Sequence, residues 1–224
     1  MAERPAFYTQ NGAVTSRRYT FEWFPGFAAS QKKKSIESLH RAIQNADADA
    51  KPLEISTKSG DPLGRKLSAF NLKLQQTPLE NIFQSAKVFE NGGPYPDLLD
   101  VPSKDAKRDE RLKNSGGLTA FRYQGEDFPL IPQTAFYDFI YLAAVKESLA
   151  ADEIQAITDY QYFTDIEFNP AKSLNTQART AALLKLLVEQ YGHLPDFSKE
   201  DFLRYHKEHV VYLENLSKGK LKFS

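Results

Sequence analysis

The spacing of apolar and polar residues along the chain predicts several helices and a few short strands. Apolar residues that recur every three or four positions predict helices at 28–48, 77–89, 134–149, 152–160 and 198–210 and one around Leu183–Leu187, and charge predicts a surface helix at 102–114. Alternation rich in aromatic and β-branched residues predicts strands at 17–24, 52–58 and 118–124. The first fifteen residues, with Asn11-Gly12, are expected to form an exposed arm or a turn.

These elements predict a mainly α fold of the α+β class with a small antiparallel sheet near the N-terminus. No internal repeat, low-complexity tract or separating loop interrupts the chain, so we expect one domain over 1–224. In this domain a strand–helix–strand extension at 1–60 packs on a core at 61–215. A basic tail follows at 216–224.

The segment 77–89, T-P-L-E-N-I-F-Q-S-A-K-V-F, has the clearest helix-start signal in the chain. Thr77 can cap the helix, and Glu80 lies where a capping box places an acid. Glu80, Gln84 and Lys87 recur at i, i+4 and i+7 and therefore share one stripe beside an apolar face. Such a stripe of carboxylate, amide and amine can form a site, or it can be a solvated face with one capping glutamate.

Composition restricts the chemistry further. The 29 Lys and Arg residues balance 29 Asp and Glu residues, so any basic footprint must be local. Without cysteine there is no disulfide framework, thiol nucleophile or cysteine-ligated zinc, and the four histidines are scattered, so no metal site is expected. No apolar run reaches the roughly 18 residues of a spanning helix and no signal-peptide core is present, so a cytoplasmic protein is expected.

Standard catalytic motifs are absent, since the chain has no G-x-S-x-G elbow, P-loop, G-x-G-x-x-G turn or zinc-deaminase motif. Acid, base or electrostatic chemistry from Glu, Asp and Lys remains. Cleavage of an N-glycosidic bond suits these groups, because a carboxylate can stabilise charge at the anomeric carbon or deprotonate a water, and a donor can protonate the departing nitrogen. A lysine can also attack an opened sugar aldehyde. This chemistry requires no metal.

Two stretches of the chain resemble the NADAR superfamily. Gly64–Asn71 and the helix after it resemble the family's S-N-F-like turn and its helix E-H-x-F-Q-A-x-K-F. Ala69 stands where the family usually has Asn, and Asn81 where it usually has His. The matching positions are Ser68, Phe70, Glu80, Phe83, Gln84, Lys87 and Phe89.

The second stretch is Tyr162–Asp165, Y-F-T-D, which resembles the family's aromatic pair followed by a small residue and Asp. The usual glycines around it are replaced, at Thr164 among other positions. The family then has an asparagine-containing loop that enters a final helix, and either Asn175 or Gln177 fills its amide position.

The segment Tyr19–His40 resembles the NADAR antitoxin branch encoded beside DarT toxins, and the likeness covers nearly the whole chain. In that branch the toxin attaches ADP-ribose from NAD to guanine in DNA, and the NADAR partner hydrolyses the modification. The resemblance therefore implies a DNA ADP-ribosyl-guanine glycohydrolase with a single multihelical NADAR-like fold and no cofactor. Its implied partners are ADP-ribosylated DNA in single-stranded form, ADP-ribose as product and a cognate DarT-type toxin, with no membrane.

The resemblance also implies roles for individual residues. Glu80 is the expected catalytic carboxylate, Lys66 or Lys87 the amine, and Asp165 the residue that orients the ribose hydroxyls. The expected substrate-binding residues are Arg65, Ser68, Phe70, Asn71, Phe83, Gln84, Phe163, Asn175, Gln177 and Arg179. The lysine run at the start of helix 28–48 is expected to contact the DNA backbone, although it can equally be an ordinary solvated surface; it comprises Lys32, Lys33 and Lys34.

Two other functions stay open. One is an N-glycosidase acting on phosphorylated riboflavin-pathway intermediates, which another branch of the superfamily resembles. The other is a non-catalytic antitoxin that binds ADP-ribose or the toxin itself.

Overall fold

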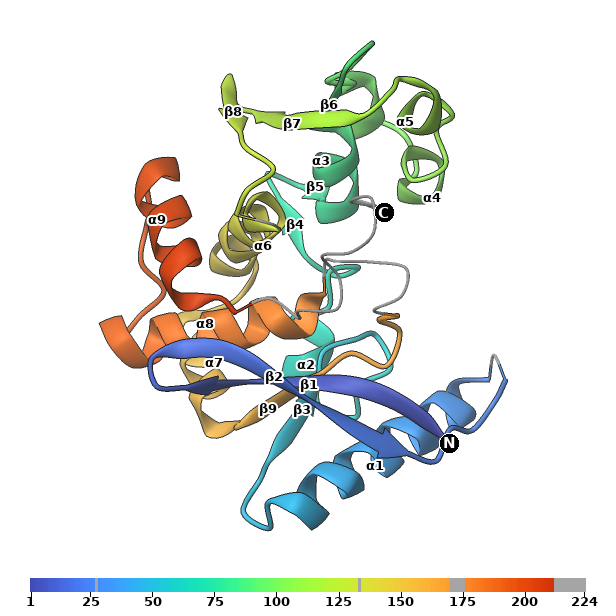
Figure 1. Cartoon of the computed structure of the whole chain (residues 1–224), viewed down its shortest axis with the longest axis vertical. Coiled ribbons are helices and arrows are strands. Elements are labelled where there is room, and N and C mark those ends of the chain that lie inside the picture. The colour runs from blue at the N-terminus through green and yellow to red at the C-terminus, as the bar shows by residue number, and fades with distance from the viewer. Residues whose placement is uncertain (27, 133, 170–175, 212–224) are drawn as a thin grey trace. The chain divides into compact units, whose positions relative to one another are not determined.

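The computed structural model describes residues 1–26, 28–132, 134–169 and 176–211 (Figure 1). Contacts along the chain divide it into two units. Unit 1 comprises Met1–Ser68, Leu149–Asp196 and Glu208–Ser224, and unit 2 comprises Ala69–Ser148 and Phe197–Lys207. The organisation expected from the sequence, an extension at 1–60 on a core at 61–215, stays a prediction.

Unit 1 is built on a four-stranded sheet with the order β2-β1-β9-β3. β1 (Ala2–Gln10) and β2 (Ala13–Phe21) form an antiparallel hairpin, and β9 (Tyr162–Thr164) pairs antiparallel with β1 and parallel with β3 (Pro52–Glu54). The expectation of an exposed N-terminal arm is wrong, because the first residues form β1. Asn11-Gly12 supplies the two positive φ angles, 52° and 74°, that a tight hairpin turn requires.

Helices cover both faces of this sheet, as Figure 1 shows for α1 (Ala29–Ala46) and α8 (Gln177–Tyr191). The buried face of α1 packs against Ala6, Tyr19 and Phe21 of the hairpin. Successive strand residues point to opposite faces, so Phe7, beside Ala6, lies on the other face, in register with Phe163 of β9. α8 contacts β1, β2 and β9.

Short elements complete unit 1, namely α2 (Pro62–Lys66), α7 (Ala151–Gln155) and the 3₁₀ turn η2 (Ala156–Asp159). Asp61 is the N-cap residue of α2, and its side chain accepts a hydrogen bond from the backbone N–H of Leu63 at 2.8 Å. A Cβ atom at Gly64 would lie 2.1 Å from the backbone oxygen of Glu54, so only glycine lets α2 approach the end of β3 this closely.

Unit 2 contains a three-stranded antiparallel sheet in the order β6-β7-β8, a two-stranded ladder and several helices. Its strands are β4 (Lys73–Leu74), β5 (Thr77–Pro78), β6 (Lys87–Phe89), β7 (Leu118–Tyr123) and β8 (Glu126–Phe128). Its helices are α3 (Leu79–Ser85), η1 (Pro96–Leu99), α4 (Ser103–Ala106), α5 (Arg111–Asn114), α6 (Ala135–Ser148) and most of α9 (Lys199–His209).

The core of unit 2 is aromatic. The rings of Phe83 on α3, Phe121 on β7 and Phe136 on α6 lie within 6.2 Å of one another, centroid to centroid. α6 is buried along most of its length, as its apolar sequence predicts. The fold is therefore mixed α+β, with an N-terminal β-hairpin and more strand than the sequence pattern suggested.

The helix predicted at 77–89 is shorter than expected. It begins at Leu79 and ends at Ser85, because residues 77–78 pair with β4 and residues 87–89 pair with β7. Its N-cap is Pro78, which forms no side-chain cap, so Thr77 and Glu80 do not form a capping box. Lys87 consequently lies on a strand. The single surface helix expected at 102–114 is instead two short helices, α4 and α5.

Candidate functional site

Glu80, the expected catalytic carboxylate, lies in the first turn of α3 with its side chain 27% exposed. Its Oε1 accepts a hydrogen bond of 2.7 Å from Nε2 of Gln84, one turn along the same helix. The ammonium of Lys107 lies 3.9 Å from the same oxygen. Glu80 is therefore engaged by side chains and not by the backbone of its own helix start.

Lys87 is an unusual lysine because its side chain lies in the core. The residue is 4% exposed, and its ammonium lies 4.9 Å from the centre of the Phe83 ring. Burial lowers the pKa of Lys87 to about 8, against an opposing effect of the Glu80 charge and a further lowering by Lys107. A neutral amine is accordingly accessible near physiological pH at this position, which is the property a nucleophilic lysine needs.

Gln84 donates its amide N–H to Glu80 and has an amide oxygen that is not engaged. It is 1% exposed, and its Oε1 has no hydrogen-bond partner. An unmade hydrogen bond of a buried acceptor costs about 1–3 kcal/mol, so such an atom marks a place where a ligand or a water can bind. Glu80, Gln84, Lys87 and Lys107 form a cluster in unit 2 that we call the α3 cluster.

A second polar cluster lies in unit 1, where β3 and β9 end side by side. Glu54 is 2% exposed and accepts hydrogen bonds from Oγ1 of Thr164 at 2.6 Å and from the backbone N–H of Ile166 at 2.9 Å. Nε2 of His40 forms a hydrogen bond of 2.9 Å with the same Thr164 hydroxyl. Burial raises the pKa of Glu54 and lowers that of His40 to about 4, so this histidine is neutral.

Asp165 follows Thr164 and completes this group, which we call the β9 cluster: His40, Glu54, Thr164, Asp165 and Gln177. The Asp165 carboxyl accepts hydrogen bonds from the backbone N–H groups of Glu167 at 3.1 Å and Phe168 at 3.2 Å and from the side chain of Gln177. Burial, aided by the charge of Glu54, raises the pKa of Asp165 to about 8. Two buried carboxyl groups with raised pKa values are typical of functional sites.

The other expected site residues fall into three groups. Phe83 and Phe163 pack in the cores of their units, and Phe70 is 75% exposed. Lys66 is exposed and forms an ion pair with Glu153, so among the expected amines only Lys87 lies in the α3 cluster. Of the rest, Arg65 donates to the Ser59 and Gly60 carbonyls, Asn71 is exposed, Ser68, Gln177 and Arg179 are buried, and Asn175 lies outside the described residues.

The expected DNA-contacting lysines differ among themselves. Lys33 and Lys34 are exposed on α1. Lys32 is instead 17% exposed, pairs with Glu167 at 3.3 Å and lies 5.0 Å from the centre of the Trp23 ring. Its charge is therefore satisfied within unit 1.

Sequence reasoning missed Glu54 and Lys107. The signal for Glu54 is a charged residue between Leu53 and Ile55, since a parallel strand covered on both faces is otherwise apolar. Nothing in the sequence marks Lys107 among the charges around it. No group of three or more His, Cys, Asp or Glu residues within the described ranges could hold a metal ion, and no described helix is long and apolar enough to cross a membrane.

A comparison with protein families finds one whose model matches a stretch that includes both polar clusters. The model of the DarT1-associated NADAR antitoxin family matches residues 2–215, nearly the whole chain. A comparison with curated proteins finds no match.

We predict that Asp165→Asn makes stability less dependent on pH. Because the pKa of Asp165 is raised to about 8 from 3.8, the folded protein binds this proton more tightly than the unfolded chain, and the free energy of unfolding falls as pH rises from about 4 to about 8. One such group contributes a slope of up to about 1.4 kcal/mol per pH unit. Asparagine keeps the acceptor for the two backbone N–H groups and does not titrate.

Denaturant unfolding at several pH values measures this slope, with Asp49→Asn, an exposed position, as the control. A slope in Asp165→Asn equal to that of the wild type would contradict the prediction.

Proposed function

The chain belongs to the DarT1-associated NADAR antitoxin family, and on this premise we propose that it hydrolyses the bond between ADP-ribose and guanine in DNA, reversing a DarT-type toxin. NADAR enzymes are in general ADP-ribosyl glycohydrolases, so the family supports the reaction class. The observation that carries the proposal for this chain is the α3 cluster, in which the family-matching Glu80 and Gln84 are joined by a 2.7 Å hydrogen bond and share a buried neighbourhood with Lys87.

The cluster suits hydrolysis of an N-glycosidic bond. As the bond between the anomeric carbon and the guanine nitrogen breaks, positive charge develops on the sugar, and a partly buried carboxylate stabilises it more strongly than water would. Glu80 can also take a proton from the attacking water, whose oxygen bonds to the anomeric carbon, while the departing nitrogen receives a proton. The products are ADP-ribose and the unmodified base.

Lys87 offers an alternative use of the same sugar. Its amine, neutral in part near pH 8, can attack the anomeric carbon of the ring-opened ribose, which is joined to the guanine nitrogen as an imine. The base then leaves with a proton on its nitrogen, and water hydrolyses the Schiff base on Lys87 to release ADP-ribose and the free amine. Lys66, the other expected amine, is exposed and ion-paired, which favours Lys87 for this role. Asp165, in unit 1, is proposed to orient ribose hydroxyls, as the resemblance to the family implies.

Glu80→Gln is expected to abolish release of ADP-ribose from ADP-ribosylated single-stranded DNA, with a loss of at least about a hundredfold. Glutamine keeps the shape of the side chain and its contact with Gln84 but carries no charge to stabilise the sugar cation. Chromatography of released ADP-ribose measures the rate, and circular dichroism verifies the fold.

Glu153→Gln, which removes a carboxylate of unit 1 that is 31% exposed and thus about as accessible as Glu80, is the matched control. Full activity in Glu80→Gln would leave Glu80 without a catalytic role.

Lys87→Met is expected to reduce the rate by at least about tenfold, whereas Lys66→Met leaves it close to the wild-type value. Methionine replaces the buried lysine with an apolar chain of similar length, so the aromatic core stays packed. If the amine forms a Schiff base, borohydride treatment during turnover couples ADP-ribose to the wild-type protein and to Lys66→Met but not to Lys87→Met, as mass spectrometry of the intact protein measures. Equal rates in the two variants would remove Lys87 from the mechanism.

The DNA part of the proposal is supported by the exposed Lys33 and Lys34. Activity on a short oligonucleotide should fall as salt rises, because each phosphate contact contributes about −0.7 to the slope of log affinity against log salt for a single strand. Replacing both lysines by Gln should reduce the magnitude of that slope by about 1.4, because two contacts of about 0.7 each are lost, and should raise KM without changing kcat. A small-molecule substrate would show little salt dependence, and an unchanged slope in the double variant would contradict the role of these two lysines.

A further inference from the structure

A charged segment of unit 2, residues 96–114, stands next to the α3 cluster, and we call it the arm. It comprises η1, α4, α5 and their connections, and its buried side chains are Leu98 and Ala106. With so little apolar surface the arm cannot be held in place by burial. It is held by hydrogen bonds instead.

The first attachment is Asn81 of α3, next to Glu80 in the chain. Asn81 is 0% exposed, and its Nδ2 donates to the backbone carbonyls of Leu98 and Val101, both at 2.7 Å. Its Oδ1 accepts a hydrogen bond of 2.6 Å from Oγ of Ser103. Both amide donors and the acceptor are thus used on the arm, so the start of α4 is fixed to the helical turn that carries Glu80.

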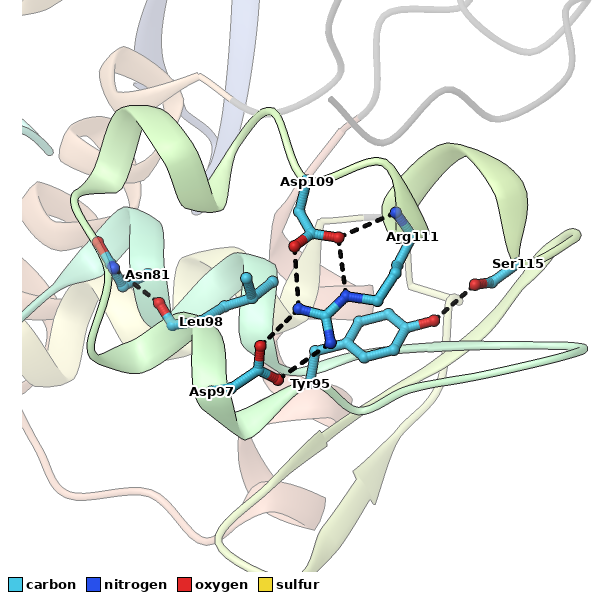
Figure 2. Close-up of polar contacts among 7 residues, drawn as sticks. All are labelled: Asn81, Tyr95, Asp97, Leu98, Asp109, Arg111 and Ser115. Carbon is cyan, nitrogen blue, oxygen red and sulfur yellow. Dashed lines mark hydrogen bonds and ion pairs between the residues drawn. The ribbon is translucent and has the colours of Figure 1, made fainter.

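The second attachment is Arg111, shown in Figure 2. Its guanidinium donates to both carboxyl oxygens of Asp97 and of Asp109, at 2.5–3.2 Å, and its centre lies 4.5 Å from the centre of the Tyr95 ring. The Tyr95 hydroxyl in turn lies 2.5 Å from Oγ of Ser115, just beyond the arm. Asp97 and Asp109 both belong to the arm, so these bidentate pairs hold its two ends together, and the contact of Arg111 with the Tyr95 ring fixes them to the residue just before the arm.

Between the two attachments the arm presents Lys107, the C-cap residue of α4. Its ammonium lies 3.9 Å from Oε1 of Glu80, and its side chain is 54% exposed. The charge of Lys107 also opposes protonation of the buried Lys87. The α3 cluster therefore sets two amines against one carboxylate. A second cation beside a buried one is electrostatically unfavourable, unless an anion binds there and offsets it.

We propose that Lys107 contacts a phosphate group of the substrate and that Asn81 and Arg111 act as positioning residues that hold Lys107 next to Glu80. The long ion pair with Glu80 keeps the ammonium in place until the phosphate arrives. Both the pyrophosphate of ADP-ribose and a DNA backbone supply this chemistry. The inference deepens the proposed function, on which it rests for its substrate.

Lys107→Gln, Lys107→Arg and the control Lys104→Gln, which changes an exposed lysine of the same arm, test the contact. Calorimetry with free ADP-ribose and fluorescence anisotropy with an unmodified single-stranded oligonucleotide distinguish the two phosphate sources. Lys107→Gln is expected to bind one of them roughly tenfold more weakly, since a charge-assisted hydrogen bond is lost. Its KM should rise by a similar factor with little change in kcat, and Lys107→Arg should restore both. Equal binding of both ligands by Lys107→Gln and Lys104→Gln would overturn the contact.

Arg111→Gln tests the positioning. The residue is exposed, so the substitution leaves the fold intact, and hydrogen exchange should rise in the arm. KM is expected to rise as it does in Lys107→Gln. The double variant Lys107→Gln/Arg111→Gln should have the same KM as Lys107→Gln alone. Asn81→Leu should behave in the same way where it folds. Additive effects in the double variant would overturn the positioning role.

The failure of this inference and that of the proposed function are distinguishable. If the wild type releases no ADP-ribose from DNA but its binding of ADP-ribose or DNA depends on Lys107, the proposed reaction fails and the phosphate contact stands. If the wild type is active and Lys107→Gln matches the Lys104→Gln control in binding and KM, the contact alone fails. A wild type that binds neither ligand overturns both.

Discussion

The burial of one amine is the constraint on which the α3 cluster depends. Pairing between β6 and β7 sets Lys87 opposite Phe121, where its side chain enters an aromatic core and lies over the Phe83 ring. An ammonium in such a place is costly unless charge or a π face compensates for the lost water. Glu80 provides the charge, and Gln84 holds Glu80 by a hydrogen bond. The same helix carries Asn81, so the helix that compensates the buried amine also anchors the arm.

The β9 cluster of unit 1 buries carboxyl groups where the α3 cluster buries an amine. Glu54 and Asp165 are buried carboxyl groups held by backbone N–H groups and neutral side chains, namely Thr164, Gln177 and, through Thr164, His40. Hydrogen bonds to the ionised forms lower the two pKa values, but burial outweighs them and the net shift is upward. A carboxyl group that keeps its proton near neutral pH can donate a hydrogen bond, which suits contact with sugar oxygens.

Much of this arrangement could be predicted from local sequence, and the failures have physical causes. The long apolar helix α6 and the turn at Asn11-Gly12 follow from composition alone. The helix predicted at 77–89 was wrong at both ends. Thr77-Pro78 and Val88-Phe89 form strands instead, because they pair with β4 and β7. The helical pattern predicted that Lys87 lies near Glu80, as it does, but Lys87 reaches that position from strand β6 and not from the helix. The pairing partners of residues 87–89 lie on β7, 29 to 34 residues further along the chain, and are not visible in a local pattern.

Residues whose role depends on distant contacts were the hardest to predict. Glu54 is recognisable as part of a polar cluster only once β9 brings Asp165 beside it, and Lys107 as a neighbour of Glu80 only once Asn81 holds the arm in place. Asn81 is a third example. The resemblance to the family identified it as a departure from a usual histidine but implied no role for it. Its amide makes three hydrogen bonds to one segment, two of them donated, and a neutral imidazole has only one donor. A histidine at this position could therefore not make the three hydrogen bonds by which Asn81 holds the arm.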